Sequence, residues 1–406
     1  MNEQNKKVPT VRFKGFTNDW EQQKLGDFGS VAMNKRIFKK QTTEVGDVPF
    51  YKIGTFGKKP DAYISNELFE EYKSKYPYPK EGDLLISASG SIGRIVEYKG
   101  QKAYYQDSNI VWLKHNDQLN NLFLKAFYQI VKWDGTEGST IKRLYNKNIL
   151  RTRIFLPTTL EQEKVGNIIE CIERLLALQQ RKLDLLKQLK KGLLQKMFAD
   201  KDSERPVLRF KGFHDDWEQR RLGEVTSHRG GTAIEKYFDE NGEYKVISIG
   251  SYGLDSKYVD QNIRAKSNEV TNERVVHAGE LTMVLNDKTA NGTIIGRSLL
   301  IENDNEYVIN QRTEIIKPEE SFNAKFAYTL LNGPFRNKVK RIVQGGTQIY
   351  VNYSSVEKLT VPLPNMKEQQ KIGSFFNQLD SLIALHQRKQ NHLKLLKKSL
   401  LQQMFM

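Results

Sequence analysis

One short pattern in this sequence has the residue types of a catalytic metal site. Pro60-Asp61 is followed by Glu71-Tyr72-Lys73, an arrangement that holds magnesium in many nucleases because carboxylates on adjacent strands can meet one metal ion. The segment SNELFEEYKSK, residues 65–75, nevertheless has the composition of a charged helix, and the second half of the chain does not repeat the pattern. We therefore favour a solvated helix face and keep a nuclease using Asp61, Glu71 and Lys73 as the less favoured alternative.

Other catalytic patterns are missing from the sequence. It contains no phosphate-binding Gly-x-x-x-x-Gly-Lys-Ser/Thr loop, no His-Glu-x-x-His, no Gly-x-Ser-x-Gly and no two adjacent prolines, and its six histidines are scattered. We predict no catalytic site, metal or cofactor in this chain.

Cys171, the single cysteine, excludes an internal disulfide, and we expect it in the core on the apolar face of a helix. Without an apolar run long enough for a membrane span or signal peptide, we expect a cytoplasmic protein.

Basic and polar loops suggest a different chemistry, the binding of DNA. The chain has 64 Lys+Arg against 48 Asp+Glu, a net charge of +16, which favours a polyanionic partner. Glycines allow a backbone to approach phosphates, which Lys and Arg neutralise, while Arg, Asn, Gln and Thr can pair with base edges. Any one basic loop could simply be solvated, but these loops recur in both halves. The candidate DNA-binding residues are Lys35, Arg36, Lys39, Lys58, Arg94, Thr140, Lys142, Arg143, Tyr145, Arg229, Lys288, Arg297, Thr347, Gln348 and Tyr350.

The elements that carry these loops occur twice. RFKGFTNDWEQQKLG begins at Arg12 and RFKGFHDDWEQRRLG begins at Arg209, and a block of about 40 residues that begins at Leu156 recurs at Leu363. Between these repeats, DLLISA, NIVWL, YKVISI, TIIGRSLLI and TEIIK are predicted strands, while LNNLFLKAFYQIVKW and NAKFAYTLLNGPFRNKVKRI are predicted helices. Each middle segment is therefore an α/β globule.

Each repeated block predicts one long helix. Pro157 and Pro364 end the preceding strand, and Thr158 with Glu161, like its counterpart Asn365 with Glu368, has the spacing of a helix N-cap. Apolar residues then follow steps of three and four, as in a coiled coil. The predicted helix-pairing residues are Ile169, Ile172, Leu176, Leu183, Leu186, Leu193 and Met197 in the first helix, and Phe376, Leu379, Ile383, Leu393, Leu400 and Met404 in the second.

The simplest partner for each helix is the other helix, packed antiparallel. One register would place Gln179 near Lys397 and His386 near Lys190, which keeps polar groups away from leucine. Parallel packing, or docking of the helices onto other subunits, is the alternative.

The predicted fold class is α/β: two pseudo-twofold-related α/β target recognition domains separated by two long helices packed as an antiparallel coiled coil. We expect the first domain over residues 1–155, the first helix over 156–199, the connector and second domain over 200–362, and the second helix over 363–406.

With its paired order of opening, variable globule and long helix, nearly the whole chain resembles the specificity subunits of type I restriction-modification systems. The matching motifs are Arg-Phe-x-x-Phe…Trp…Leu-Gly, at Arg12 and Arg209, and Pro…Glu-Gln…Ile/Val, at Pro157 and Pro364.

The resemblance implies that each globule reads one half of a bipartite DNA site and that the helices set the gap between the halves. It further implies two modification subunits, which carry S-adenosylmethionine and methylate adenine N6, and restriction subunits that use ATP and Mg. Exposed helix faces and the repeated openings are candidates for the modification-subunit contact, although the openings could equally dock each globule to its helix. A stand-alone DNA-binding repressor is the main alternative function.

Overall fold

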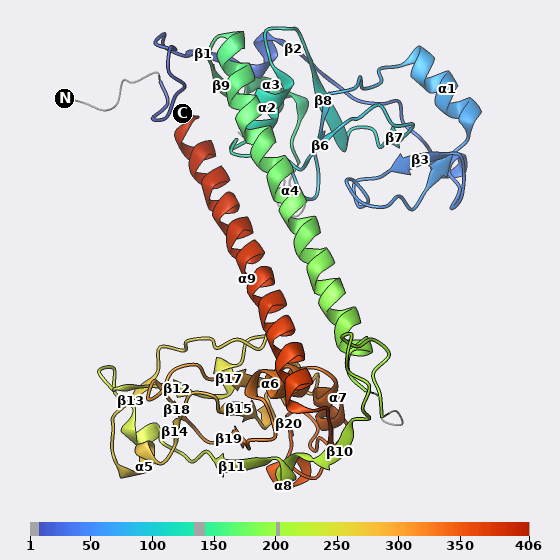
Figure 1. Cartoon of the computed structure of the whole chain (residues 1–406). Coiled ribbons are helices and arrows are strands. Elements are labelled where there is room, and N and C mark those ends of the chain that lie inside the picture. Colours follow the sequence, from blue (N-terminus) through green and yellow to red (C-terminus); the bar gives the residue numbers. More distant parts are fainter. Residues whose placement is uncertain (1–7, 134–142, 200–203, 406) are drawn as a thin grey trace, which may run out of the picture. The chain divides into compact units, whose positions relative to one another are not determined.

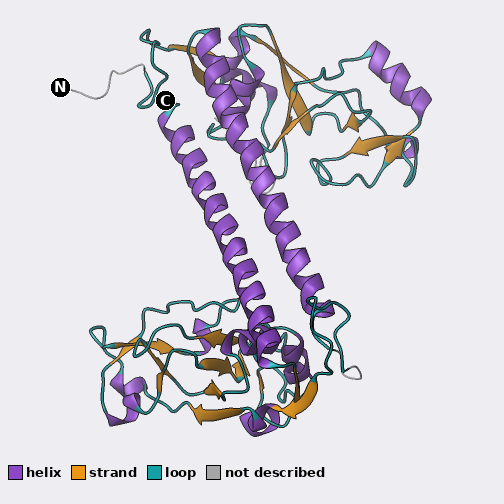
Figure 2. Ribbon diagram, viewed as in Figure 1, coloured by secondary structure: helices purple, strands orange, loops and turns teal. Residues whose placement is uncertain are grey.

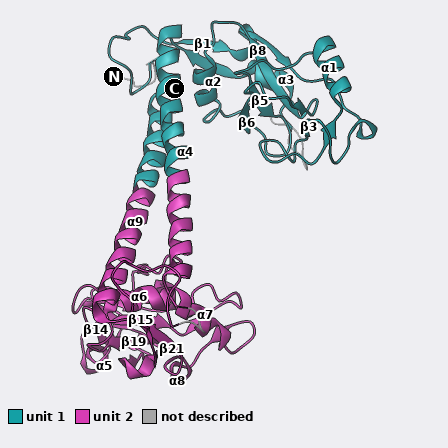
Figure 3. Cartoon of the chain, turned by 45° about the vertical axis from the view of Figure 1, so that its right-hand side comes forward, with its two compact units in different colours: residues 1–180, 389–406 teal, residues 181–388 magenta. Residues whose placement is uncertain are grey.

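The computed structural model describes residues 8–133, 143–199 and 204–405 (Figure 1). The chain forms two compact units. Unit 1 comprises residues 1–180 and 389–406, and unit 2 comprises residues 181–388 (Figure 3). Each unit thus contains one globule together with parts of both long helices.

Unit 1 is built on an antiparallel sheet of order β2-β8-β5-β6, in which Gly29 pairs with His115 and Leu85 with Trp112. A smaller sheet of order β4-β3-β7 lies in the segment between β2 and β8, and β1 pairs with β9. The strands are β1 (Glu21–Lys24), β2 (Gly29–Ala32), β3 (Val48–Tyr51), β4 (Tyr63–Ile64), β5 (Leu84–Ser87), β6 (Ile95–Glu97), β7 (Tyr104–Tyr105), β8 (Ile110–His115) and β9 (Arg153–Leu156).

Unit 2 repeats this plan. Its sheet of order β11-β19-β15-β17 has the same register, since Thr226 pairs with Pro318 and Thr282 with Ile315. The strands are β10 (Glu218–Arg221), β11 (Thr226–Gly230), β12 (Tyr244–Ile247), β13 (Arg264–Ala265), β14 (Val275–Val276), β15 (Leu281–Val284), β16 (Asn286–Asp287), β17 (Ser298–Leu300), β18 (Tyr307–Ile309), β19 (Thr313–Pro318), β20 (Ile349–Tyr350) and β21 (Thr360–Leu363). This shared register confirms the predicted repeat of one α/β fold.

Short helices complete each globule (Figure 2). Unit 1 has α1 (Asn66–Lys75), α2 (Asn121–Phe127) and α3 (Asn146–Arg151), and unit 2 has α5 (Glu269–Asn272), α6 (Ala324–Asn332), α7 (Pro334–Arg341) and α8 (Tyr353–Val356). The predicted single helix over 323–342 is broken because Gly333 leaves helical geometry and Pro334 starts a new helix. Within TIIGRSLLI only β17 is a strand, since Gly296 turns the backbone at φ 69°.

The two long helices are α4 (Thr159–Lys196) and α9 (Met366–Gln403), each of 38 residues. Pro157 and Pro364 directly follow the last residues of β9 and β21, as predicted. The Glu161 amide donates to Thr158 Oγ1, and the Glu368 amide donates to Asn365 Oδ1 at 3.0 Å, which confirms the N-caps. All of the predicted helix-pairing residues are buried or half-buried.

Within each unit, parts of the two helices lie against each other. In unit 1, Lys397 Nζ lies 2.7 Å from Glu173 Oε1 and Gln390 donates to Gln180, so α9 runs antiparallel to α4. In unit 2, Lys190 pairs with Asp380.

These ion pairs correct the predicted register. Lys397 lies beside Glu173, not Gln179, and Lys190 lies beside Asp380, not His386, a difference of six residues in each case. The register therefore brings opposite charges together. The prediction had been based only on keeping polar groups away from leucine.

Cys171 is exposed, so the prediction that it belongs to the core is wrong. Its neighbours Ile169 and Ile172 occupy the buried face of α4, and Cys171 points away from them.

The end of each long helix completes a core. In unit 1, Phe405 follows α9 and packs against Trp20 and Phe123, with ring centroids 6.3 and 5.0 Å away. In unit 2, Phe198 follows α4 and packs against Trp217 and Phe326, at 6.2 and 5.6 Å. The hydrophobic core of each globule therefore includes a residue from the end of the helix that starts in the other repeat.

The repeated openings hold each globule to the start of its own helix. The Arg12 guanidinium donates two hydrogen bonds, of 2.6 and 2.8 Å, to Glu161, whose side chain is fully buried. Arg209 binds Glu368 in the same way, with both hydrogen bonds at 2.7 Å. The glutamates of the predicted caps thus use their side chains to bind the openings, which supports the docking role considered above.

Candidate nucleic-acid interface

In both units, three separated segments form the frame of the candidate interface. In unit 1, Ala88 directly follows β5. Its amide donates to the Asn109 carbonyl at 2.7 Å, and its carbonyl accepts a hydrogen bond from the Leu144 amide at 2.8 Å. In unit 2, Leu285 makes the same two bonds, to Arg312 and Val351. The loops that carry most of the predicted DNA-binding residues are therefore brought together by one backbone scheme.

In unit 1, Arg143 and Tyr145 line a cavity of about 600 Å³ together with Met33, Ser108 and Lys147. The Arg143 guanidinium donates to the Ser108 carbonyl at 3.1 Å and lies 5.7 Å from the Tyr145 ring centroid. Lys147 lies at 5.8 Å from the same ring. Tyr145 remains 42% exposed, so an aromatic face with two neighbouring cations is available to a nucleic acid.

The second basic loop of unit 1 follows β5. Arg94 donates to the Phe56 carbonyl at 2.9 Å and so connects this loop to the turn that contains Lys58. Gly93 has φ 79°, and a Cβ there would lie 2.8 Å from the Trp133 indole nitrogen, so glycine is required for this close approach.

The remaining unit 1 candidates lie after β2. Lys35 is 4.9 Å from the Tyr76 ring centroid, and Arg36 pairs with Asp107 at 2.8 Å while remaining exposed. Lys39 begins a 3₁₀ turn and is also exposed. The candidates Thr140 and Lys142 lie outside the described residues.

In unit 2, Asp287 shapes the corresponding loop. Burial by itself would raise the pKa of this carboxyl group, but hydrogen bonds from the backbone amides of Ile294 and Thr289 outweigh it and lower the pKa. The Ile294 amide lies 2.8 Å from Asp287 Oδ2, and the Thr289 amide lies 3.0 Å from Oδ1. An ionised Asp287 therefore closes the loop after Lys288 into a fixed turn.

A cationic cluster lies behind this loop, comprising Arg297, Arg336 and Lys340. Arg336 donates to the carbonyls of Ile295 and Gly292, both at 2.9 Å. Burial, reinforced by the charge of Arg297, lowers the pKa of Arg336 to about 10. Burial and the charges of both arginines also lower the pKa of Lys340. The three positive charges repel one another, and an approaching phosphate would relieve that repulsion.

Arg336 and Lys340 were missed in the sequence analysis. Both lie on α7, within PFRNKVKR, which the sequence marks only as part of a helix. Their spacing of four residues places them on one helix face, and this was the signal that could have identified them.

The other unit 2 candidates form a hairpin beside the cluster. Gln344 and Tyr350 exchange backbone hydrogen bonds of 2.8 and 2.9 Å, and Thr347 and Gln348 lie at the tip. A Cβ at Gly345 would lie 2.3 Å from the Gln348 carbonyl oxygen, so the turn needs glycine there. β20, which contains Tyr350, pairs with β16, and Lys288 follows β16 directly.

Arg229 is not brought together with these residues. It lies in β11 and binds Glu280, which precedes β15, whereas the candidate loop follows β15. It is therefore at the opposite end of that strand.

The metal-like pattern of unit 1 is dispersed among ordinary surface ion pairs. Asp61 Oδ1 lies 2.9 Å from Lys52, and Glu71 Oε1 lies 2.9 Å from Lys75. Glu71 and Lys73 belong to α1, which confirms the predicted charged helix.

A family model described as Type I restriction modification DNA specificity domain matches the chain twice, over residues 17–188 and 214–395. The chain belongs to this family. Both copies of the repeat, with their globules and most of each long helix, are included in the matches.

Individual relatives agree with this assignment. A Haemophilus influenzae protein, provisionally named as a type I restriction enzyme specificity subunit, is 58% identical over 152 residues, which cover 37% of this chain and 40% of that protein. The MjaVIII specificity subunit of a type I restriction enzyme from Methanocaldococcus jannaschii is 24% identical over 94% of this chain and 91% of its own length. The S subunit of the M. genitalium type I restriction-modification system has the same fold, with a TM-score of 0.66, 15% identity and coverage of 98% of this chain and 99% of that one.

None of the helices that the structure describes is long and apolar enough to cross a membrane.

Proposed function

We propose that this chain is the DNA sequence-specificity subunit of a type I restriction-modification complex, in which each globule reads one half of a bipartite site. The observation that carries the proposal is the position of Arg297, Arg336 and Lys340 against the loop of residues 292–295: Arg297 donates to the Thr293 carbonyl, Arg336 donates to the Gly292 and Ile295 carbonyls, and Lys340 Cε would lie 3.6 Å from a Cβ at Gly292. Polar and basic groups occupy the equivalent edge of unit 1, around Arg143 and Tyr145. Two copies of one frame with different side chains suit two different half-sites.

The repeat also suits two copies of one protein partner. Exposed leucines recur at equivalent positions of α4 and α9: Leu175, Leu178 and Leu189 correspond to Leu382, Leu385 and Leu396. We infer that these apolar positions contact two modification subunits, which supply S-adenosylmethionine and the adenine-N6 methylation, while restriction subunits supply ATP- and Mg-dependent translocation and cleavage. The 38-residue helices set the unread gap, and this chain is a non-catalytic subunit that acts on cytoplasmic DNA.

Methylation mapping tests the division of labour. N6-methyladenine is mapped genome-wide in cells that make this chain with its cognate modification subunit, and in cells where residues 224–361 come from another such protein. The matched control exchanges residues 27–155 instead. We expect a bipartite motif in which each exchange alters a different half. Methylation that does not depend on this chain, or an exchange that alters neither half, would refute the proposal and favour the stand-alone repressor.

A matched pair of lysines on α7 tests the cluster itself. Lys340 belongs to it, whereas Lys338 donates to the Thr360 carbonyl at 2.7 Å. We expect Lys340→Ala to weaken DNA binding and to reduce the slope of log K against log salt concentration by about one. Lys338→Ala removes the same charge from the same helix and is expected to leave the slope unchanged. Equal effects of the two variants would show that net charge, and not this site, governs binding.

A further inference from the structure

The two units differ in how they neutralise one acidic group at the start of a central strand. In unit 2, Glu280 precedes β15 and has a side chain only 6% exposed. The Arg229 guanidinium donates to both of its carboxylate oxygens, at 2.9 and 3.1 Å, and to the Val275 carbonyl at 3.2 Å. One arginine on β11 thus neutralises Glu280, although β19 lies between β11 and β15 in the sheet.

The equivalent acid in unit 1 is Asp83, which precedes β5. Gly82 and Gly279 stand before the two acids with φ 92° and 86°. In unit 1 the Lys80 amide donates to the Asp83 carboxylate at 2.7 Å, and in unit 2 the His277 amide donates to Glu280 at 2.9 Å. The local backbone around the acid is therefore the same in both copies.

The position that supplies the arginine in unit 2 holds alanine in unit 1. Arg229 pairs across the sheet with Ile315, and Ala32 pairs with Trp112 at the same register step of β2 and β8. Ala32 has no side chain that could reach the carboxylate. Among the residues that the structure describes, no basic side chain forms a salt bridge with Asp83, although the charges of His115, Lys80 and Lys114 act on it from further away.

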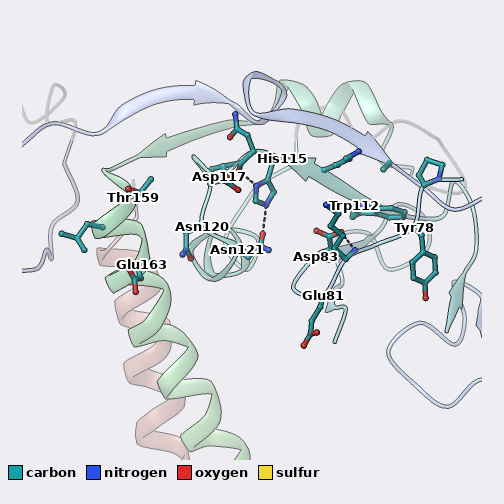
Figure 4. A pocket seen from close by; sticks show the side chains of 17 residues that line it. Tyr78, Glu81, Asp83, Trp112, His115, Asp117, Asn120, Asn121, Thr159 and Glu163 are labelled. Carbon is teal, nitrogen blue, oxygen red and sulfur yellow. Dashed lines mark hydrogen bonds between the residues drawn. The ribbon is translucent and has the colours of Figure 1, made fainter. Parts of the chain in front are cut away.

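A cavity of about 700 Å³ occupies the place of the missing arginine (Figure 4). Ala32, Asp83, Trp112, His115 and Tyr78 all line it. In Figure 4, Asp83 lies on the same side of the cavity as Trp112, with His115 and its hydrogen-bond partner Asn121 across from them. Tyr78 is the counterpart of Val275, the residue whose carbonyl binds Arg229 in unit 2.

The state of Asp83 agrees with an unfilled cation site. Burial raises the pKa of this carboxyl group, and the hydrogen bond from the Lys80 amide and the nearby cations offset that effect only in part. A guanidinium ion in the cavity would lower the pKa again and would fill space that Arg229 fills in unit 2.

We propose that this cavity binds a guanidinium group, namely an arginine side chain presented by a protein partner. Guanidinium is favoured over ammonium because its planar group can donate two N–H hydrogen bonds to one carboxylate, as Arg229 does to Glu280 in unit 2. A protein is favoured over DNA because Asp83 repels phosphate and precedes β5, whereas the candidate DNA-binding loop follows β5. The cavity thus lies at the start of β5, on a different surface of unit 1 from the candidate DNA-binding loop after β5.

The first experiment uses methylguanidinium as the probe and the full chain with ¹⁵N-labelled tryptophan. The chain has four tryptophans, and Trp112→Phe identifies the indole signal of Trp112. We expect methylguanidinium to shift that signal, Asp83→Asn to weaken its binding about tenfold, and Ala32→Arg to abolish binding by filling the cavity from within. Equal binding by the wild type and Ala32→Arg would overturn the proposal, as would no shift in the wild type.

A converse experiment opens the matching site in unit 2. Arg229→Ala leaves Glu280 buried without its cation, so the unfolding temperature is expected to fall and to be restored in part by millimolar methylguanidinium. Sodium chloride at equal ionic strength is the control for screening. Failure of methylguanidinium to restore stability more than sodium chloride would show that such a cavity does not select guanidinium, and would overturn the comparison on which the proposal rests.

A third measurement distinguishes a protein source of the arginine from a free guanidinium compound. We expect Ala32→Arg and Asp83→Asn to weaken assembly of this chain with its cognate modification subunit, while Arg229→Lys, a control at the other copy, does not. If methylguanidinium binds but neither variant changes assembly, the site takes a free cation and the protein-partner inference is wrong. The methylation maps measure DNA recognition by the individual domains and do not depend on the guanidinium experiments. The proposed DNA-reading function and the proposed arginine site can therefore fail independently.

Discussion

The ring of Phe405 provides a direct test of how unit 1 is assembled. It is 7% exposed and packs in edge and tilted contacts against Trp20 and Phe123, two fully buried residues. Phe405→Ala removes the ring from a core whose other buried members, apart from Leu401 and Met404, lie more than two hundred positions earlier in the chain. The surrounding side chains belong to a strand and helix framework that can close only partly around the space left behind.

The expected loss of stability is about 3–4 kcal/mol. Truncation of a buried phenylalanine costs about 3–5 kcal/mol, and each of the two aromatic contacts accounts for roughly 0.5–1.5 kcal/mol of this. We take the lower part of that range because Phe405 lies near the end of the described chain, where the backbone can adjust. With a urea m-value of about 2–3 kcal/mol/M, the unfolding midpoint of unit 1 should fall by more than about 1 M.

Hydrogen–deuterium exchange of the full chain, followed peptide by peptide in increasing urea, measures the two units separately. Phe405→Ala should accelerate exchange in β2, β5 and β8 and leave β15 and β19 unchanged. Phe198→Ala, the matched variant, should do the reverse. If Phe405→Ala loosens only the end of α9, or loosens the sheet of unit 2, our account of how the cores are completed is refuted.

Three further predictions concern single contacts. Arg12→Ala should destabilise unit 1 by about 3 kcal/mol because Glu161 would remain buried without its cation, and urea unfolding should show a clear recovery when Glu161→Gln is added. The hydrogen bond from Lys125 lowers the pKa of Glu170. The stability that this pair contributes is therefore fully present above pH 4.5 and is lost as the pH falls through the lower pKa of the folded state. In thermal unfolding, Glu170→Gln should reduce stability at pH 7 but not at pH 2. Gly345→Ala should distort the hairpin, where φ is 96°, and weaken DNA binding with little change in overall unfolding, and equal affinity would exclude the hairpin from the interface.

The sequence predicted the long helices and the repeated α/β frame because their signals are local and occur twice. Prolines and N-caps at Thr158 and Asn365 mark where the helices begin, and apolar steps of three and four mark the buried faces. The register was mispredicted because it depends on which charges meet across the pair. Glu173 and Asp380, which lie outside the apolar pattern, are the residues that bind the lysines.

Side-chain roles in the loops were harder to predict because they depend on contacts between distant segments. Arg229 and Arg297 are similar in sequence terms, each an arginine beside glycine or small residues. Only the fold shows that Arg229 neutralises Glu280, whereas Arg297 is held beside Arg336. Lys340 was missed for the same reason, since a basic residue on a short helix becomes informative only when the loop packed against it is known.

The contribution of both chain regions to unit 1 has a consequence for synthesis on the ribosome. Unit 2 is continuous, from residue 181 to 388, and can close as soon as that stretch has emerged, whereas unit 1 also needs residues 389–406. Domains generally fold in the order in which they are made, at about 5–20 residues per second. In this chain we expect unit 2 to complete its folding before unit 1, although most of unit 1 is translated first. Trp20 and Phe123 lack the Phe405 ring that packs against them until translation reaches that residue.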